Sequence, residues 1–200
     1  MSDLIVPFLG YERVERSDKR YEEYAYVLDY LPHGRPGTRP GYRAGALIQV
    51  VGEEYFTFLE AIARDGVVLK TSDRVYVGKD SRRKITYIIG RINYEDLTSN
   101  SKMELSGTVE KIVINREPWF INFFNTAQAI TPRMHALELI PGIGKKYMWQ
   151  IIDERDRKPF QNLEDLQNRA NMPTPSKLIT RRILEELAGE SKYRLFTRAP

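Results

Sequence analysis

The residues best suited to chemistry in this chain form a glycine-rich turn that carries two lysines. Two glycines at such a turn allow positive φ and close approach of the backbone, where a side chain would clash. The amides that begin the following helix would point outward, with the positive end of that helix behind them. These amides and the lysine ammonium groups could together bind a phosphate oxygen. The turn consists of Pro141, Gly142, Ile143, Gly144, Lys145 and Lys146.

Contact of this kind uses only backbone amides and ammonium groups, so it cannot distinguish one base sequence from another. We expect the turn to bind the backbone of a nucleic acid; a plain tight turn between two helices is the alternative interpretation. Other basic and hydroxyl side chains could make secondary contacts. In the C-terminal region these are Ser176, Lys177, Arg181 and Arg182, and nearer the middle of the chain they are Lys79, Arg82, Arg83 and Lys84.

No catalytic or metal-binding constellation accompanies the turn in the sequence. The chain has no cysteine and only two histidines, His33 and His135, which lie far apart. This excludes a thiol nucleophile, cysteine-ligated zinc and a multi-histidine metal site. The separation between Lys146 and Glu164 or Asp165 is similar to that between the catalytic lysine and acid of some DNA glycosylases. However, the two acids lie in the first turn of a predicted helix, where they are explained by capping and by the helix dipole. We therefore expect neither an enzyme nor a cofactor or metal.

The net charge is concentrated in the last third of the chain. Lys and Arg total 31 and Asp and Glu total 27, which gives +4. Residues 1–131 hold 18 of each sign, whereas residues 132–200 hold 13 basic and 9 acidic residues. No apolar run approaches the roughly 20 residues of a membrane span, and the N-terminus has no signal-peptide pattern. The sequence thus indicates a soluble, cytoplasmic protein with a basic C-terminal region and no membrane partner.

The first half of the chain predicts short β-strands. Apolar and β-branched runs separated by Gly, Pro and Asp turns are typical of strands joined by tight connections. Five or six such strands within about 75 residues favour a small closed or partly open β-barrel, of which the OB-fold is one kind. Residues 1–20 show no sustained periodicity, so a loose arm or an added short element is expected there. The predicted strands are 24–31, 46–51, 56–61, 67–69, 74–77 and 85–92.

The second half of the chain predicts helices. Thr98 or Ser99 can cap a helix whose apolar residues recur with the helical period. The dense apolar run 118–124 is predicted to form a seam between the β part and the C-terminal part. Thr131 can cap a short helix that begins with Pro132 and ends at the glycine-rich turn. Three further helices are predicted over 145–156, 163–170 and 176–188, the last two capped by Asn162 and Thr174.

The segment 137–153, which reads LELIPGIGKKYMWQIID, closely resembles the helix-hairpin-helix motif. The similarity continues into 160–166, which is similar to the Phe and Asp-Leu positions that follow the hairpin in competence-type DNA-binding domains. Over the whole chain the sequence resembles DUF655, an archaeal family of unknown function, through 26–34, 95–98, 123–125 and 137–146. This resemblance implies a β-barrel joined to a helix-hairpin-helix domain, and a nucleic-acid-binding role, often with RNA, without an assigned reaction.

The sequence departs from the helix-hairpin-helix pattern at one place. Such domains usually pair two hairpins about a pseudo-twofold axis, so that both strands of a duplex are bound. The second hairpin position reads NMPTPSK over 171–177 and lacks the Gly-x-Gly of the first. Because proline has no amide hydrogen to donate, we do not expect this half to bind phosphate in the same way.

These patterns predict an α+β protein with a small OB-like β-barrel followed by an α-helical helix-hairpin-helix domain. The expected divisions are an N-terminal arm at 1–20, the barrel with a linking helix and the seam at 21–130, and the helix-hairpin-helix domain at 131–200. The predicted function is sequence-nonspecific binding of nucleic acid, with RNA slightly favoured over DNA by the resemblance. The alternative is an adaptor that binds a protein partner in a ribonucleoprotein or repair complex, without direct nucleic-acid contact.

Overall fold

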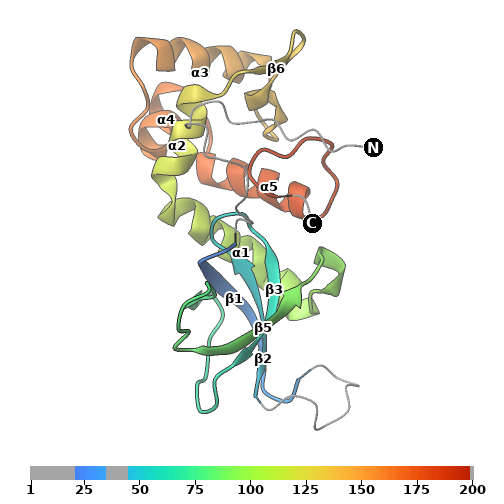
Figure 1. The fold of residues 1–200 in the computed structure, drawn as a ribbon. Helices are drawn as coiled ribbons and strands as arrows, with labels where there is room; N and C mark the ends of the chain where they lie inside the picture. Colours follow the sequence, from blue (N-terminus) through green and yellow to red (C-terminus); the bar gives the residue numbers. More distant parts are fainter. Residues whose placement is uncertain (1–20, 35–44, 199–200) are drawn as a thin grey trace. The chain divides into compact units, whose positions relative to one another are not determined.

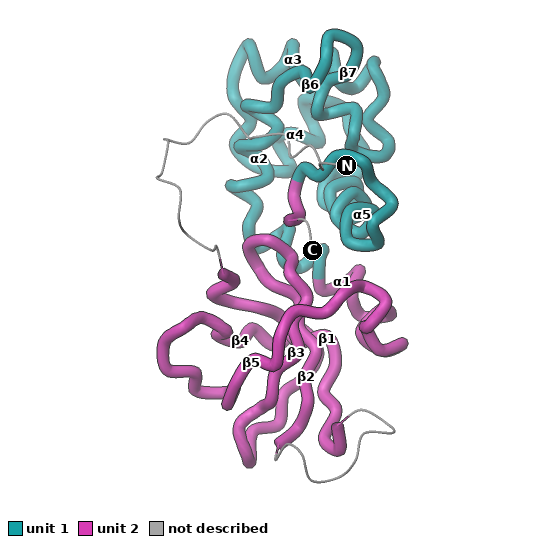
Figure 2. Tube along the Cα trace, turned by 45° about the vertical axis from the view of Figure 1, so that its right-hand side comes forward, with its two compact units in different colours: residues 1–16, 109–195 teal, residues 17–108, 196–200 magenta. Residues whose placement is uncertain are grey.

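The structure is a computed structural model of the 200-residue chain, and it describes residues 21–34 and 45–198 (Figure 1). The chain separates into two compact units (Figure 2). In the described residues, unit 1 comprises 109–195, and unit 2 comprises 21–34, 45–108 and 196–198. The division falls within helix α1 (Ser99–Asn115), whereas the sequence patterns placed a boundary at residue 131. The expected N-terminal arm lies outside the described residues.

Unit 2 is built around a five-stranded antiparallel sheet that curls into a half barrel (Figure 1). The strand order is β4-β1-β2-β3-β5, so β4 and β5 are the two edges of the sheet. The predicted α+β class is thereby confirmed. The run 67–69 forms no strand, although Leu69 packs into the core of the unit. The strands are β1 (Tyr24–Leu31), β2 (Leu47–Gly52), β3 (Phe58–Ala63), β4 (Arg74–Tyr76) and β5 (Ile85–Arg91).

The central strands β2 and β3 are buried along their whole lengths, because both faces of the sheet are covered. Successive side chains of a strand point to opposite faces. One face presents small and branched apolar residues, including Val27, Ile48 and Val50, to the core of the unit. The amide of Gln49 lies between two of these residues in sequence and therefore points to the opposite face.

Buried polar groups join this opposite face to the start of α1. The Gln49 side-chain oxygen accepts hydrogen bonds from the Thr98 amide (2.9 Å) and the Ser101 hydroxyl (2.7 Å). Its nitrogen donates to Glu60 (3.0 Å), and the Thr98 hydroxyl donates to Asp29 (2.7 Å). Thr98 also accepts from the Ser101 amide, so it is the cap of α1, as one of the two predicted alternatives had it. Because the hydrogen bonds of the buried Gln49 amide are made in this way, they favour one arrangement of α1 on the sheet over others.

Unit 1 contains helices around an apolar core that includes Phe120, Phe124, Leu137, Ile151 and Leu166. The run predicted as a seam forms α2, whose buried face lies within this core. The three predicted C-terminal helices are confirmed, but Thr174, the predicted cap of the last of them, forms no side-chain cap. After α1, the elements in chain order are α2 (Glu117–Thr126), β6 (Ala129–Thr131), β7 (Met134–His135), the 3₁₀ helix η2 (Ala136–Leu139), α3 (Lys145–Arg157), α4 (Leu163–Arg169) and α5 (Pro175–Leu187).

The prediction of a helix that begins at Thr131 and Pro132 is wrong. Thr131 instead pairs with Met134 across a two-residue turn, so these residues form the hairpin β6–β7. Proline is also favoured at the second position of such a turn, where its fixed φ is suitable, and the sequence signal therefore fits both structures. Helical structure begins only after His135, and it is the short 3₁₀ segment η2 rather than an α-helix.

Candidate functional site

The glycine-rich turn lies between η2 and α3 in unit 1. Two backbone hydrogen bonds hold it, from the Ile140 amide to the Leu137 carbonyl (3.1 Å) and from the Ile143 amide to the Ile140 carbonyl (2.9 Å). Ile143 is 3% exposed and therefore anchors the turn in the core. The turn is thus a fixed structure between two helical segments.

The two glycines of the turn have different roles. Gly142 has φ +93°, and an added Cβ would lie 3.2 Å from Cδ2 of Leu178 on α5. Gly144 has φ −83° and ψ 178°, so it does not use the positive φ that glycine allows. An added Cβ at Gly144 would meet nothing within 4 Å. Gly142 is therefore required by the fold, whereas Gly144 leaves open space in front of the start of α3.

The amides at the start of α3 have no acceptor in the described residues. The first helical hydrogen bond of α3 runs from the Met148 amide to the Gly144 carbonyl (3.0 Å). Within residues 21–34 and 45–198, no side chain caps the helix, and the amides of Gly144, Lys145, Lys146 and Tyr147 form no hydrogen bond. Four amides at the positive end of a helix are therefore available to an external acceptor.

Both lysines of the turn are exposed, and neither has an ion-pair partner in the part of the chain that the structure describes. The first turn of α3 also contains no acidic residue. Cations at this end of a helix are unfavourable by about 0.3–1 kcal/mol each, because the helix dipole places positive charge there. The start of α3 therefore concentrates positive charge that no described residue of unit 1 neutralises.

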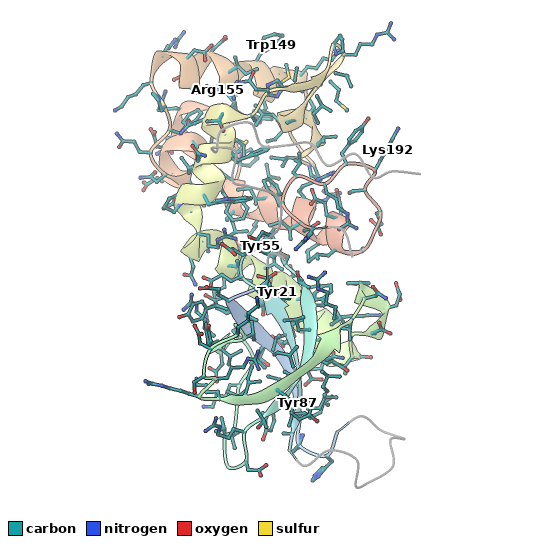
Figure 3. All side chains as sticks on the ribbon, viewed as in Figure 1. Tyr21, Tyr55, Tyr87, Trp149, Arg155 and Lys192 are labelled. Carbon is teal, nitrogen blue, oxygen red and sulfur yellow. The ribbon has the colours of Figure 1, made fainter. Side chains whose placement is uncertain are left out.

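Trp149 is a candidate for contact with a ligand that the sequence patterns did not single out. It lies in the segment 137–153, and 58% of its surface is exposed. Figure 3 labels its position on α3. The helical period could have indicated that Trp149 is exposed. Met148 and Ile151 lie on the buried face of α3, and Trp149 lies about 100° around the helix from Met148, away from that face. It follows Lys145 by four residues, so the two side chains are neighbours on one face of α3.

The expected secondary contacts on α5 are partly accessible. Lys177 and Arg181 are exposed, and Arg181 forms an ion pair with Glu185 one turn away (3.3 Å). Ser176 is half-buried, and its hydroxyl lies 3.3 Å from the Glu110 carboxylate. Two cations of α5 thus remain at the surface of unit 1.

Arg182 does not lie at this surface, so its expected contact with a ligand is wrong. It is 6% exposed, and its Nε donates to the fully buried Glu186 (2.8 Å). The guanidinium also donates to the carbonyl of Tyr193, and Glu186 accepts from the amide of Leu195 (2.7 Å). Arg182 therefore holds the segment that follows α5 and is not available to a ligand.

The four expected contacts nearer the middle of the chain belong to unit 2. Lys79, Arg83 and Lys84 are exposed, and the ammonium of Lys79 lies 4.6 Å from the ring centre of Tyr21. Arg82 is half-buried, because its Nε donates to two backbone carbonyls of its own loop. The glycine-rich turn belongs to unit 1, so these residues and the turn are parts of different units.

His135 caps η2, just before the turn. Its Nδ1 accepts a hydrogen bond from the Leu137 amide (3.1 Å), so this nitrogen carries no proton. The Glu138 carboxylate in turn accepts from the His135 amide (2.9 Å), which completes a capping box. Burial, and secondly the positive charge of Arg155, lower the pKa of His135 below 6.5. The imidazole is therefore a neutral structural cap at physiological pH.

Neither a metal site nor a membrane-spanning helix is found in the described ranges. No group of three or more His, Asp or Glu side chains there could hold a metal ion. No helix in those ranges combines the length and the apolar composition needed to cross a membrane.

Comparison with known proteins gives three matches. A family model described as "Protein of unknown function (DUF655)" matches residues 21–198. An uncharacterized protein of Methanocaldococcus jannaschii is 41% identical over 182 residues, which is 90% of this chain and 82% of that protein. A crystal structure of a DUF655 protein from Archaeoglobus fulgidus is 47% identical in sequence and superposes with a TM-score of 0.82. The superposition covers 88% of this chain and 100% of that one. The similarity thus extends over both units.

Proposed function

Because the chain belongs to DUF655, a family of unknown function, we propose from its own geometry that it binds nucleic acid without sequence specificity. The contact is made by the turn 141–146, which binds a backbone phosphate. We take the segment from η2 through α3 to be a helix-hairpin-helix motif, and the curled sheet of unit 2 to be an OB-like barrel.

The start of α3 is the observation that carries this proposal. Its free amides, its two exposed lysines and its lack of acidic residues all favour an anion at the same place. A bound phosphate would remove the unfavourable interaction of Lys145 and Lys146 with the helix dipole. A helix start built only for stability would instead carry an acidic or hydroxyl cap.

The open space at Gly144 defines how a phosphate approaches. Because no Cβ covers the amides, an oxygen can come within hydrogen-bond distance of the backbone. Backbone amides and ammonium groups contact phosphate alone, and such contacts carry no information about base sequence. The expected binding is therefore independent of sequence.

The second turn, before α5, does not duplicate this arrangement. Asn171 and Thr174 adopt positive φ, no side chain caps the helix, and Pro175 at its first position has no amide hydrogen to donate. We therefore propose one principal phosphate contact, with Lys177 and Arg181 adding long-range attraction. Affinity should be modest and should fall steeply as salt rises.

The test is a fluorescence anisotropy titration at several salt concentrations with labelled single-stranded and duplex RNA and DNA of one mixed sequence. The variant Lys145→Glu/Lys146→Glu is expected to weaken binding at least about 100-fold, since two attractive charges become repulsive. The milder variant Lys145→Ala/Lys146→Ala should reduce the slope of log K against log salt by about 0.7–0.9, the value for the one phosphate that the turn binds. The preferred ligand decides between RNA and DNA, for which only the family resemblance favours RNA.

Lys158→Glu/Lys192→Glu is the matched control, because it makes the same change in net charge at two other lysines of unit 1. It should weaken binding only a few-fold. If it weakens binding as much as the turn variant, overall charge and not the turn attracts the ligand. If the wild type binds none of the four ligands at low salt, the turn is structural and the adaptor function takes its place.

A further inference from the structure

Unit 2 contains a groove of about 310 Å³ beside its edge strand β4. Aromatic side chains from β1 and β4, Tyr24 and Tyr76, line it together with the cations Arg74, Arg83 and Lys84. The groove therefore combines flat rings with positive charge. This composition is typical of surfaces that bind single-stranded nucleic acid, where bases stack and the backbone follows the cations.

One wall of the groove is a preorganised stack. The guanidinium carbon of Arg74 lies 3.5 Å from the ring centre of Tyr24, and Glu53 accepts from the Nε of Arg74 (2.8 Å). The Tyr24 and Tyr76 rings meet edge to face, with their centres 5.3 Å apart. The Arg74 side chain is nonetheless 46% exposed. Because Glu53 neutralises its charge, the planar group is suited to stacking with a base more than to binding phosphate.

The loop 77–84 supplies the free charge of the groove from a fixed backbone. Arg82 donates from its Nε to the carbonyls of Val77 (3.3 Å) and Gly78 (2.7 Å), which closes the loop on itself. Arg64 donates from its amide to the Lys84 carbonyl (2.9 Å) and from its guanidinium to the Arg82 carbonyl (2.8 Å). The hydrogen bonds from Arg64 thus fix the loop on both sides of Arg83.

The side chains of Arg83 and Lys84 are exposed and have no ion-pair partner among residues 21–34 and 45–198. At Gly78 an added Cβ would lie 2.4 Å from the Tyr76 hydroxyl oxygen, so the tyrosine packs directly on the loop backbone. Two unneutralised cations therefore lie in the same groove as a planar stacking surface.

We propose that this groove binds one nucleotide of a single-stranded nucleic acid, with its base on the Arg74–Tyr24 stack and its phosphate on Arg83 and Lys84. A duplex does not fit this description, because its bases are already stacked on one another and are not available to side chains. The site has the same class of ligand as the proposed function, but it depends on unit 2 alone and not on the turn 141–146.

The test uses the full chain with Lys145→Glu/Lys146→Glu as background, so that the turn does not contribute. A labelled six-nucleotide single strand, (U)6 or (dT)6, and a twelve-base-pair duplex serve as probes for anisotropy at low salt. Arg74→Lys keeps the charge next to Glu53 but removes the planar group, and we expect it to weaken single-strand binding about five-fold or more. Arg83→Ala/Lys84→Ala should reduce the slope of log K against log salt by about 0.7 for each phosphate that the groove no longer binds.

Lys70→Ala/Arg91→Ala is the matched control, since it removes two exposed cations of unit 2 that do not line the groove. It should change single-strand affinity less than two-fold, and circular dichroism should show that every variant is folded. Equal effects of the control and of Arg83→Ala/Lys84→Ala, or unchanged affinity in Arg74→Lys, would overturn the proposal.

Failure of the proposed function has a different signature. In that case Lys145→Glu/Lys146→Glu binds all probes as the wild type does, while the groove variants still weaken single-strand binding. If instead the groove proposal fails, the turn variant loses binding and the groove variants change nothing in either background.

Discussion

Two helices of unit 1, α3 and α4, begin in opposite ways. At the start of α4, the Asn162 side chain accepts from the Asp165 amide (2.7 Å), and Glu117 accepts from the Leu163 amide (2.7 Å). The first turn of α4 also carries Glu164 and Asp165, whose charge suits the helix dipole. The start of α3 has lysines in place of these acids and no side-chain acceptor.

This difference separates a structural helix start from one that is available to a ligand. Both helices have the same unsatisfied amides at their first turn, as every α-helix does. In α4 side chains of unit 1 satisfy two of them, whereas in α3 no described residue satisfies any, and two cations lie beside them. Removing the side-chain acceptors from α4 should therefore lower the stability of the protein. Adding an acceptor at the start of α3 should raise stability and weaken the binding of phosphate.

The largest expected effect comes from removing the acceptors of α4. Asn162→Ala/Glu117→Ala should lower the free energy of unfolding by about 2–3 kcal/mol, because the helix loses its cap and the Leu163 amide loses a charged acceptor. Urea unfolding followed by circular dichroism measures it. Nucleic-acid binding should not change. Glu164→Ala, in the same turn, should change stability by no more than about 0.5 kcal/mol. A stable double variant, or one that no longer binds, would contradict the assignment.

Gly142→Ala should have the next largest effect. Its positive φ is strained for any residue with a Cβ, and the new methyl would crowd Leu178, so we expect a decrease of about 1–3 kcal/mol in unfolding free energy. Gly144→Ala is the comparison, since its φ is ordinary and its Cβ meets no neighbour. Its decrease should stay below about 1 kcal/mol. Equal decreases at the two glycines would show that the turn has another conformation in solution.

Gly144→Asp would make the start of α3 similar to that of α4. The new carboxylate can cap the amides of Lys146 and Tyr147, so the free energy of unfolding should rise by about 0.5–1 kcal/mol. The same carboxylate would occupy the place proposed for phosphate, and affinity should fall about ten-fold. Urea unfolding and anisotropy measure the two quantities. Gln150→Glu adds the same charge further along α3 and should change neither by much. A stabilised variant that binds as the wild type would refute the phosphate site.

The smallest expected effect is a pH dependence at His135. Burial, and then the charge of Arg155, lower its pKa in the folded state, so below about pH 6.5 the unfolded chain binds more protons than the folded chain. Stability should therefore decline as the pH falls through 6.5 toward the folded pKa. His135→Asn keeps a capping acceptor and should remove this contribution, whereas His33→Asn should not. Urea midpoints at pH 7.5 and 5.5 provide the measurement. An unchanged difference in His135→Asn would contradict it.

Local sequence signals predicted the helical elements well. The caps Thr98 and Asn162 were identified because a cap is a contact between neighbours in sequence. The strands of unit 2 were predicted to within about two residues, except at 67–69, because apolar and β-branched runs between turns are also a local pattern. The signal at Thr131 misled because a proline after threonine suits a tight turn as well as a helix start.

Contacts between distant parts of the chain were beyond these signals. Gly142 needs its missing side chain because Leu178 lies beside it, and Arg182 is buried because Glu186 and the segment after α5 enclose it. The groove of unit 2 depends on β1, β4 and the loop 77–84 meeting at one edge of the sheet. None of these tertiary contacts produces a periodic or compositional signal in the sequence.

The sequence by itself determined most of the secondary structure, the position of the glycine-rich turn and the excess of positive charge next to it. These follow from preferences that act over a few residues, such as capping, turn chemistry and helical period. Only the tertiary structure decided which glycine is strained, which amides stay free and which cations are exposed. Burial and the pairing of charges depend on neighbours that the fold brings together from far along the chain, and these neighbours decide whether a basic residue stabilises the protein or is available to bind a ligand.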